Sequence, residues 1–195
     1  YMRKILKTEN DYVIAVDTDS MYITLDKLVK MYLPDAPVER VVKFLDQACE
    51  KQFEPYIDKC YDELAVYVNA FDQKMKMKRE AIANKGIFVA KKRYILNVYN
   101  NEGVQYAEPK LKMMGIEAVR SSTPASIRDL FKKSLNIIMN SDEDTLQKFI
   151  SVEKDKFKKL SFEDVAFPRG CNELDKWVDN TGGKPYKSGT PIHVK

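Results

Sequence analysis

The chain has 195 residues, 44% of them hydrophobic and 32% charged, so it is long enough to bury one core and to carry a smaller appended unit. No stretch approaches the roughly 20 apolar residues of a membrane span, and the start, Tyr1 to Leu6, lacks the long apolar region of a signal peptide. The three cysteines have no paired short spacing, so neither a zinc knuckle nor a disulfide framework is indicated, and the single histidine, His193, leaves little material for His-dependent catalysis. We therefore expect a reducing, cytoplasmic setting and no membrane partner.

The first predicted element is a β-hairpin near the N-terminus. The short apolar run Val13–Val16 is rich in β-branched residues and predicts a buried strand, and the alternation over Met21–Leu25 predicts its antiparallel partner. The turn between them is Asp17-Thr18-Asp19-Ser20.

The two aspartates of this turn are candidate metal ligands. Carboxylates one residue apart repel each other and are costly to hold beside an apolar strand, so a cation or basic neighbours should compensate Asp17 and Asp19. Hard oxygen donors suit Mg²⁺ or Mn²⁺. An EF-hand is excluded, because Met21, Tyr22 and Leu28 stand where its third oxygen ligand, Gly and Glu would be. A plain turn, in which Asp and Ser side chains bind the local backbone, is an equally open interpretation.

Helices and then strands follow the hairpin. Apolar residues recur at helical spacing over 38–49 and again over 56–64, which predicts one long helix broken at Pro55 or two abutting helices. Four short strands are expected at 81–83, 86–90, 94–99 and 104–106, with residues 100–103 as a hairpin connection.

The last third of the chain is predicted to be helical and then loop-rich. Thr123 and Pro124 are expected to open a helix as the capping hydroxyl and the first helical residue, and Ser141 to start the next one. Lysines over 154–159 would complement the dipole at the end of that second helix, and they need no ligand to explain them. Beyond Ser161, glycines and prolines predict loops.

The formal net charge of +4 is unevenly distributed. Residues 74–112 contain ten Lys or Arg against three acids, a balance of +7 that leaves −3 for the rest of the chain. Clustered cations favour a polyanion partner, because neutralising phosphates releases counterions. A solvated basic face is the alternative reading of the same run.

These motifs together carry a family resemblance. The Asp17–Ser20 hairpin, followed by Lys91-Lys92-Arg93-Tyr94 at a strand start, resembles the palm of family B DNA polymerases. Lys78–Ala83, Ala107–Gly115 and Ser121–Pro124 strengthen the likeness, in particular to the branch found in T-even-like bacteriophages. The resemblance runs from about residue 11 to 160 and more faintly into the tail. It implies an α+β fold, with an antiparallel palm sheet and packed helices over 1–118, and a helical thumb root with a loop-rich tail over 119–195.

The resemblance also implies roles for individual residues. Asp19 would be the principal aspartate ligand of two Mg²⁺ ions, for which Mn²⁺ can substitute. Asp17 would lie beside it in the catalytic site as a weaker metal ligand, and Thr18 and Ser20 would shape the turn. The backbone of the primer strand would be held near its 3′ end by four residues: Lys91, Lys92, Arg93 and Tyr94.

Two further carboxylates could approach the metal cluster from a neighbouring strand. Glu80, in the strand expected from Lys78 to Ala83, is a candidate metal ligand, although a salt bridge with a neighbouring lysine or Arg79 explains it equally well. Glu102, in the predicted turn, is a weaker candidate.

The chain departs from the family pattern in several places. It has Ala15-Val16 where the family has Tyr-Gly, and it contains neither the Ser-Leu-Tyr-Pro-Ser motif nor the fingers helix. We therefore expect a polymerase fragment, either one product of a polymerase encoded in two pieces or a shortened domain, that is inactive alone. The implied partners are primer–template DNA, deoxynucleoside triphosphates, a sliding clamp, and an N-terminal polymerase part that carries the exonuclease, the fingers and the first palm aspartate. If the protein is encoded by a phage, the expected location is the host cytoplasm.

Two other functions compete with this one. A noncatalytic DNA-binding module would grip a duplex with residues 78–109 and keep the aspartate turn for structure only. A glycosyltransferase would use Asp17-Thr18-Asp19 at a metal and nucleotide-sugar site, but that reading leaves the basic block unexplained.

Overall fold

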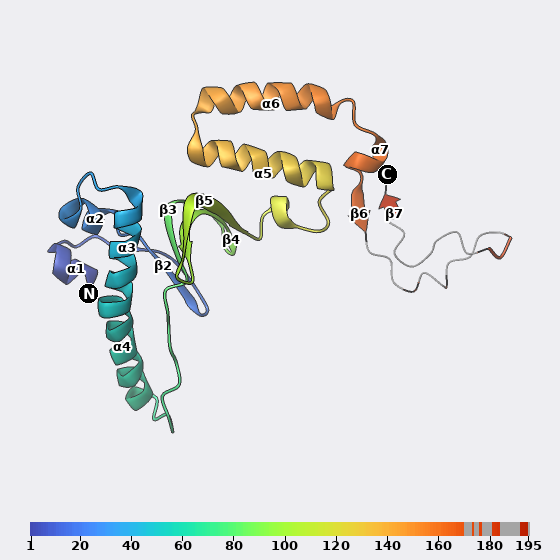
Figure 1. Cartoon of the computed structure of the whole chain (residues 1–195). Coiled ribbons are helices and arrows are strands. Elements are labelled where there is room, and N and C mark those ends of the chain that lie inside the picture. The colour runs from blue at the N-terminus through green and yellow to red at the C-terminus, as the bar shows by residue number, and fades with distance from the viewer. Residues whose placement is uncertain (170–172, 174–175, 177–180, 184–191, 195) are drawn as a thin grey trace. The chain divides into compact units, whose positions relative to one another are not determined.

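The computed structural model describes residues 1–169, 173, 176, 181–183 and 192–194 (Figure 1). The chain forms two compact units, one of residues 1–86 and 96–110 and the other of residues 87–95 and 111–195. Helices and antiparallel strands are both present, which confirms the predicted α+β class. Within the described residues, no helix is both long and apolar enough to cross a membrane.

The elements follow one another along the chain in this order: α1 (Met2–Leu6), β1 (Val13–Asp17), β2 (Ser20–Ile23), α2 (Asp26–Tyr32), α3 (Val38–Ala48), η1 (Cys49–Phe53), α4 (Glu54–Tyr67), β3 (Ala81–Ala90), β4 (Arg93–Asn101), β5 (Val104–Met114), η2 (Glu117–Val119), α5 (Ala125–Asn140), α6 (Glu143–Phe157), α7 (Phe162–Val165), β6 (Phe167–Arg169) and β7 (Ile192–Val194).

The predicted N-terminal hairpin is confirmed. β1 and β2 pair antiparallel, with Asp17 opposite Ser20 across the turn. The predicted burial of β1 is wrong, since Ile14 is 54% exposed and Val16 70% exposed. An apolar run indicates a strand, but its burial depends on whether other elements cover it, and the exposed fractions of Ile14 and Val16 show that these side chains face solvent.

The helical region predicted over 38–64 is one continuous helical run of α3, η1 and α4, so the break expected at Pro55 is replaced by a change of helix type. A π-helical segment, η1, joins α3 to α4, and Pro55 lies in the first turn of α4. Proline has no N–H to donate and its ring crowds the carbonyl four residues before it, so the wider π turn accommodates it where a regular α-helix would break. The α3 face at Val42, Leu45 and Ala48 is buried, and Val42 and Leu45 pack with Ile82 of β3.

Three strands form the larger sheet, in the order β3-β4-β5. The two strands expected at 81–83 and 86–90 are one continuous strand, β3, which corrects the prediction. Asn84 lies where the break was expected, and its Oδ1 accepts a 2.9 Å hydrogen bond from Nδ2 of Asn97, so polar residues there pair across strands and do not form a turn.

The predicted hairpin connection between β4 and β5 is confirmed. Glu102 and Gly103 have φ values of 50° and 87°, the left-handed pair that a type I′ turn requires. Asn100 Oδ1 accepts a 3.1 Å hydrogen bond from the Gly103 N–H and closes the turn.

The second unit packs α5 and η2 around a core of Ile95, Ile116, Ala118 and Met139. The predicted first residues of α5 and α6 are wrong by one or two positions. Pro124 precedes α5 and is not the first helical residue, and the Pro124 carbonyl accepts a 2.9 Å hydrogen bond from the Arg128 N–H. Among the described residues, no side chain caps the N-terminus of α5.

Helix α6 begins at Glu143 and not at Ser141, and Asp142 caps it, because its carboxylate accepts the Thr145 N–H at 2.8 Å. Lysines at the end of this helix pair locally with acids, as in Lys158 with Asp155 at 3.0 Å.

The tail is only partly the loop that was predicted. A short helix, α7, and an antiparallel pair, β6 with β7, lie among its described residues. The predicted loop positions Gly170, Pro185, Gly189 and Pro191 lie outside the described residues.

Candidate nucleic-acid interface and carboxylate turn

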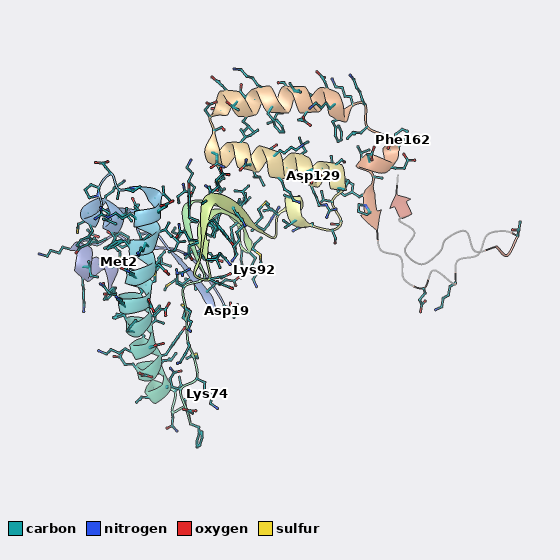
Figure 2. All side chains as sticks on the ribbon, viewed as in Figure 1. Met2, Asp19, Lys74, Lys92, Asp129 and Phe162 are labelled. Atoms are coloured by element: carbon teal, nitrogen blue, oxygen red, sulfur yellow. The ribbon has the colours of Figure 1, made fainter. Side chains whose placement is uncertain are left out.

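Asp17 and Asp19 lie at the tight turn of the β1–β2 hairpin, where Figure 2 labels Asp19. Asp17 ends β1 and is half-buried, and its Oδ1 accepts hydrogen bonds from the Thr18 N–H at 2.9 Å and the Thr18 hydroxyl at 3.3 Å. Asp19 is exposed. The turn therefore orients one carboxylate through Thr18 and presents the other to solvent.

These carboxylates do not make a closed metal site. The described residues contain no group of three or more His, Cys, Asp or Glu side chains that could hold a metal ion. Mg²⁺, however, is often bound through one or two carboxylates, with water and substrate phosphates as its other ligands. Asp17 and Asp19 fit that open pattern by number and chemistry, and metal binding by them stays a prediction.

Glu80 lies just outside the strand in which it was predicted, because β3 starts at Ala81. Its side chain is exposed, and its carbonyl accepts a 2.6 Å hydrogen bond from the Glu102 N–H. The backbones of Glu80 and Glu102 are thus side by side. Metal binding by Glu80 stays a prediction.

Arg79 has a structural role that the sequence did not reveal. Its side chain is only 13% exposed and forms an ion pair with Asp46 of α3. Two further bonds join it to distant parts of the first unit: Nη1 donates to Asn100 Oδ1 at 2.8 Å, and the backbone N–H donates to Glu54 Oε1 at 3.0 Å. These partners are 21 to 33 residues away in the chain, so no local pattern signals them. One cation of the basic block therefore holds α3, α4 and β4 together.

The predicted DNA-binding residues Lys91 to Tyr94, here called the basic turn, connect β3 to β4. Lys91 and Lys92 form the two-residue connection and are exposed, and Figure 2 labels Lys92. Arg93 and Tyr94 begin β4, as the predicted strand start required. Lys92 has a φ of 60°, a left-handed conformation that is uncommon for a residue with a side chain.

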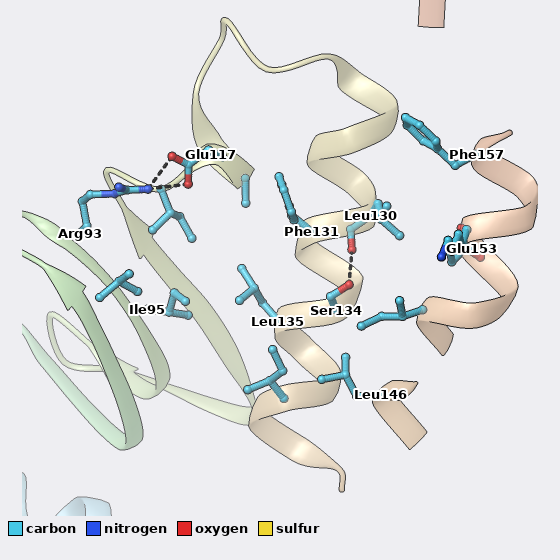
Figure 3. Close-up of a pocket in the computed structure, with 16 residues that line it drawn as sticks. Arg93, Ile95, Glu117, Leu130, Phe131, Ser134, Leu135, Leu146, Glu153 and Phe157 are labelled. Atoms are coloured by element: carbon cyan, nitrogen blue, oxygen red, sulfur yellow. Dashed lines mark hydrogen bonds and ion pairs between the residues drawn. The ribbon is translucent and has the colours of Figure 1, made fainter. Parts of the chain in front are cut away.

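The two strand residues of the basic turn contact other parts of the second unit. The centroid of the Tyr94 ring lies 5.6 Å from the centroid of the Phe88 ring across the β3–β4 hairpin. Arg93 Nη2 donates to both carboxylate oxygens of Glu117, at 2.5 and 2.6 Å (Figure 3). The sequence placed Arg93 correctly at the start of a strand but did not indicate Glu117, which is 24 residues away.

An apolar pocket of about 650 Å³ lies next to this ion pair, between the strand residues, α5 and α6 (Figure 3). Polar groups on its lining bond within the chain: Arg93 pairs with Glu117, and the Ser134 hydroxyl donates to the Leu130 carbonyl at 3.0 Å. Arg93 Nε is buried and has no acceptor among the described residues. The pocket is therefore mainly apolar, with charged groups at Arg93 and Glu117 on one side and at Glu153 and Lys154 of α6 on another.

Comparison with known proteins identifies the family. The sequence model of DNA polymerase family B matches residues 49–171, which is more than half of the chain. The chain belongs to DNA polymerase family B. Over its whole length it is also 34% identical to the DNA-directed DNA polymerase of Enterobacteria phage T4 and 34% identical to that of Escherichia phage RB69.

The two comparisons cover the candidate site differently. The family match includes the basic turn and Glu117 but begins after the carboxylate turn, whereas the alignments with the two phage polymerases include both. The chain spans only 23% and 22% of the lengths of these two relatives. Family membership is therefore established, and the activity of a whole polymerase is a matter of proposal.

Proposed function

We propose that this chain is the part of a DNA-directed DNA polymerase that supplies one aspartate hairpin of the metal site and the grip on the primer strand. The observation that carries the proposal is that two exposed charged turns of opposite sign occur in a chain aligned end to end with two proteins named DNA-directed DNA polymerase. Residues 1–118 would then belong to the palm and residues 119–195 to the start of the thumb.

Asp19 and Asp17 have different tasks in this proposal. Asp19 is exposed and acts as the direct ligand, while Asp17, already held by Thr18, acts as the second carboxylate. When two Mg²⁺ ions are bound, they supply alignment of the primer 3′-hydroxyl with the α-phosphate and neutralisation of the attacking and leaving oxygens. Thr18 and Ser20 hold the turn in shape, so that both carboxylates are presented from a short rigid loop.

The basic turn binds the DNA backbone. Lys91 and Lys92 are adjacent, exposed and held on a two-residue turn between strands, so their charges are presented together at little cost in main-chain freedom. Contacts to phosphates position a protein on DNA without reading its sequence. That property suits an enzyme that must extend primers of every sequence.

The proposal requires partners beyond this chain. Primer–template DNA and deoxynucleoside triphosphates are the substrates. The remaining polymerase part would supply the exonuclease, the fingers and the other palm aspartate, and a sliding clamp is a further candidate partner. Alone, the chain is proposed to have negligible activity, because two carboxylates are only part of the catalytic centre.

A salt titration of DNA binding tests the basic turn. Replacing both Lys91 and Lys92 by alanine should weaken binding to a primer–template duplex and reduce the slope of log Kd against log salt by about two, one for each lost phosphate contact. Replacing Lys158 and Lys159 by alanine removes the same charge from another adjacent lysine pair and should leave the slope nearly unchanged. Equal slopes for the two double variants would refute the assignment.

A noncatalytic DNA-binding module is the second candidate, favoured by the lack of a three-ligand metal cluster among the described residues. It predicts the same salt dependence but no response to divalent ions. Electron paramagnetic resonance of Mn²⁺ added with primer–template and nucleotide separates the two functions. The polymerase proposal expects Asp19→Asn to reduce Mn²⁺ binding while Asp62→Asn, an exposed aspartate of α4, does not; no difference between the variants would favour the noncatalytic module.

A further inference from the structure

We propose that Glu117 is a positioning residue of the DNA grip, which holds the Arg93 guanidinium at the end of the basic turn in the orientation that meets a backbone phosphate. The inference rests on the proposed function of the basic turn. It assigns a task to an acidic residue in a place where a negative charge would otherwise oppose DNA binding.

The hydrogen bonds around Arg93 point to this task. Both Glu117 oxygens accept from the same nitrogen, Nη2, at 2.5 and 2.6 Å, and charge-assisted bonds of this kind are the strong ones. Nε is buried without an acceptor, so within the described part of the chain Glu117 alone holds the guanidinium. One third of the Arg93 side chain is exposed, which leaves the group able to meet a ligand from solvent.

The segment that carries Glu117 also contacts the turn backbone. Gly115 has a φ of 64°, and a Cβ added there would lie 2.3 Å from the Lys92 carbonyl oxygen and 3.2 Å from Arg93 Cγ. Arg120 Nη2 donates to the Gly115 carbonyl at 3.1 Å, which ties this approach to the next part of the chain. Residues 115–117 therefore support the basic turn twice, at the main chain of Lys92 and at the side chain of Arg93.

The charge state of the pair is compatible with this role. The pKa of Glu117 is lowered, first by a hydrogen bond from its own backbone N–H and also by the Arg93 guanidinium. Glu117 is thus ionised at neutral pH. Arginine is always charged, so the ion pair persists under the conditions in which a polymerase works.

Positioning and simple electrostatics predict opposite signs for the same mutation. Removing an acid next to a DNA-binding surface should tighten binding, because one repulsive charge is gone. Removing an acid that orients a phosphate-binding arginine should weaken binding, since the freed guanidinium must be ordered again when DNA arrives. Glu117→Gln therefore tells the two apart by sign and not only by size.

The experiment measures Kd for a primer–template duplex by fluorescence anisotropy, with the whole chain. Glu117→Gln should weaken binding by roughly threefold to tenfold, the worth of one ordinary hydrogen bond. Glu108→Gln makes the same charge change at an exposed site on β5, and it should bind DNA as tightly as the parent chain or slightly more tightly. In an Arg93→Ala background, Glu117→Gln should no longer weaken binding. Glu117→Asp, which keeps the charge, should restore part of the affinity.

The outcomes are distinguishable from failure of the proposed function. If the Lys91 and Lys92 double variant keeps parental affinity, the DNA-binding assignment itself fails. If that variant loses affinity while Glu117→Gln binds as tightly as the parent or more tightly, only the positioning role fails. The positioning role would also be overturned if Glu117→Gln weakened DNA binding equally with Arg93 present and with Arg93→Ala, because Glu117 would then act through the stability of the fold. Circular dichroism of each variant checks that the fold is intact.

Discussion

Gly115 gives the sharpest test of how the basic turn is supported. Alanine at this position has two penalties: a left-handed φ of 64°, and a Cβ that would lie 2.3 Å from the Lys92 carbonyl oxygen. The left-handed conformation costs a residue with a side chain roughly 1–2 kcal/mol. The overlap forces a backbone shift, for which overpacking costs of about 1–3 kcal/mol are typical. We therefore expect Gly115→Ala to lower the free energy of unfolding by about 2–5 kcal/mol.

Gly103 is the matched control for this substitution. It also has a left-handed φ, 87°, but a Cβ added there would meet nothing within 4 Å. Gly103→Ala should therefore cost only the conformational part, roughly 1–2 kcal/mol. Urea unfolding followed by far-ultraviolet circular dichroism measures both values. A cost for Gly115→Ala no larger than that for Gly103→Ala would refute the close contact with the basic turn.

Three further predictions concern stability and reactivity. Asp46→Ala removes the ion-pair partner of Arg79 and should lower the free energy of unfolding in urea by about 2 kcal/mol. This is less than the roughly 3–5 kcal/mol of a fully buried pair, because the Asp46 side chain is 40% exposed. A cost below about 0.5 kcal/mol would contradict a stabilising ion pair between Arg79 and Asp46. Burial raises the pKa of the Cys49 thiol from 9.0 to about 11, so thiol labelling near pH 8 with peptide mapping should modify exposed Cys60 well before Cys49, and equal rates would be contrary evidence. Asp142→Ala should lower the unfolding midpoint more than Asp142→Asn, because asparagine keeps an acceptor oxygen for the Thr145 N–H. The hydrogen bond from this N–H lowers the pKa of Asp142 below 3.8, so the charge-dependent part of its stabilisation is present above pH 3.8 and should disappear as the pH falls below it. Unfolding midpoints measured from neutral to acid pH test this.

Local patterns predicted the features that local chemistry determines. The alternation around Asp17–Ser20 and the left-handed turn at Glu102 and Gly103 both appear where the sequence placed them. Pro55 predicted a helix break for a steric reason that applies in any fold, and the structure has a π-helical segment directly before it in place of a break. In each case the cause lies within a few residues of the effect.

Features that depend on distant residues were not predictable in the same way. The exposure of β1 depends on what covers its face, which no property of the run itself specifies. The basic block was visible as a charge excess, but not that Arg79 is used inside the fold or that Arg93 pairs with an acid 24 residues away. For the candidate site, the two charged turns and the role of Thr18 were predictable from local sequence, whereas the support of the basic turn by Gly115 and Glu117 was not.

Primer extension with Mg²⁺ tests whether the Asp17–Ser20 hairpin belongs to the catalytic centre of a polymerase. The polymerase is assembled from this chain and the remaining polymerase part, with Asp19→Asn compared with the Asp62→Asn control. We expect no extension by the chain alone, extension by the assembled enzyme, and a loss of about 100-fold or more for Asp19→Asn but not for the control, as expected when a group that stabilises transition-state charge is removed. Full extension by the assembled Asp19→Asn enzyme would contradict the assignment of this hairpin to the catalytic centre.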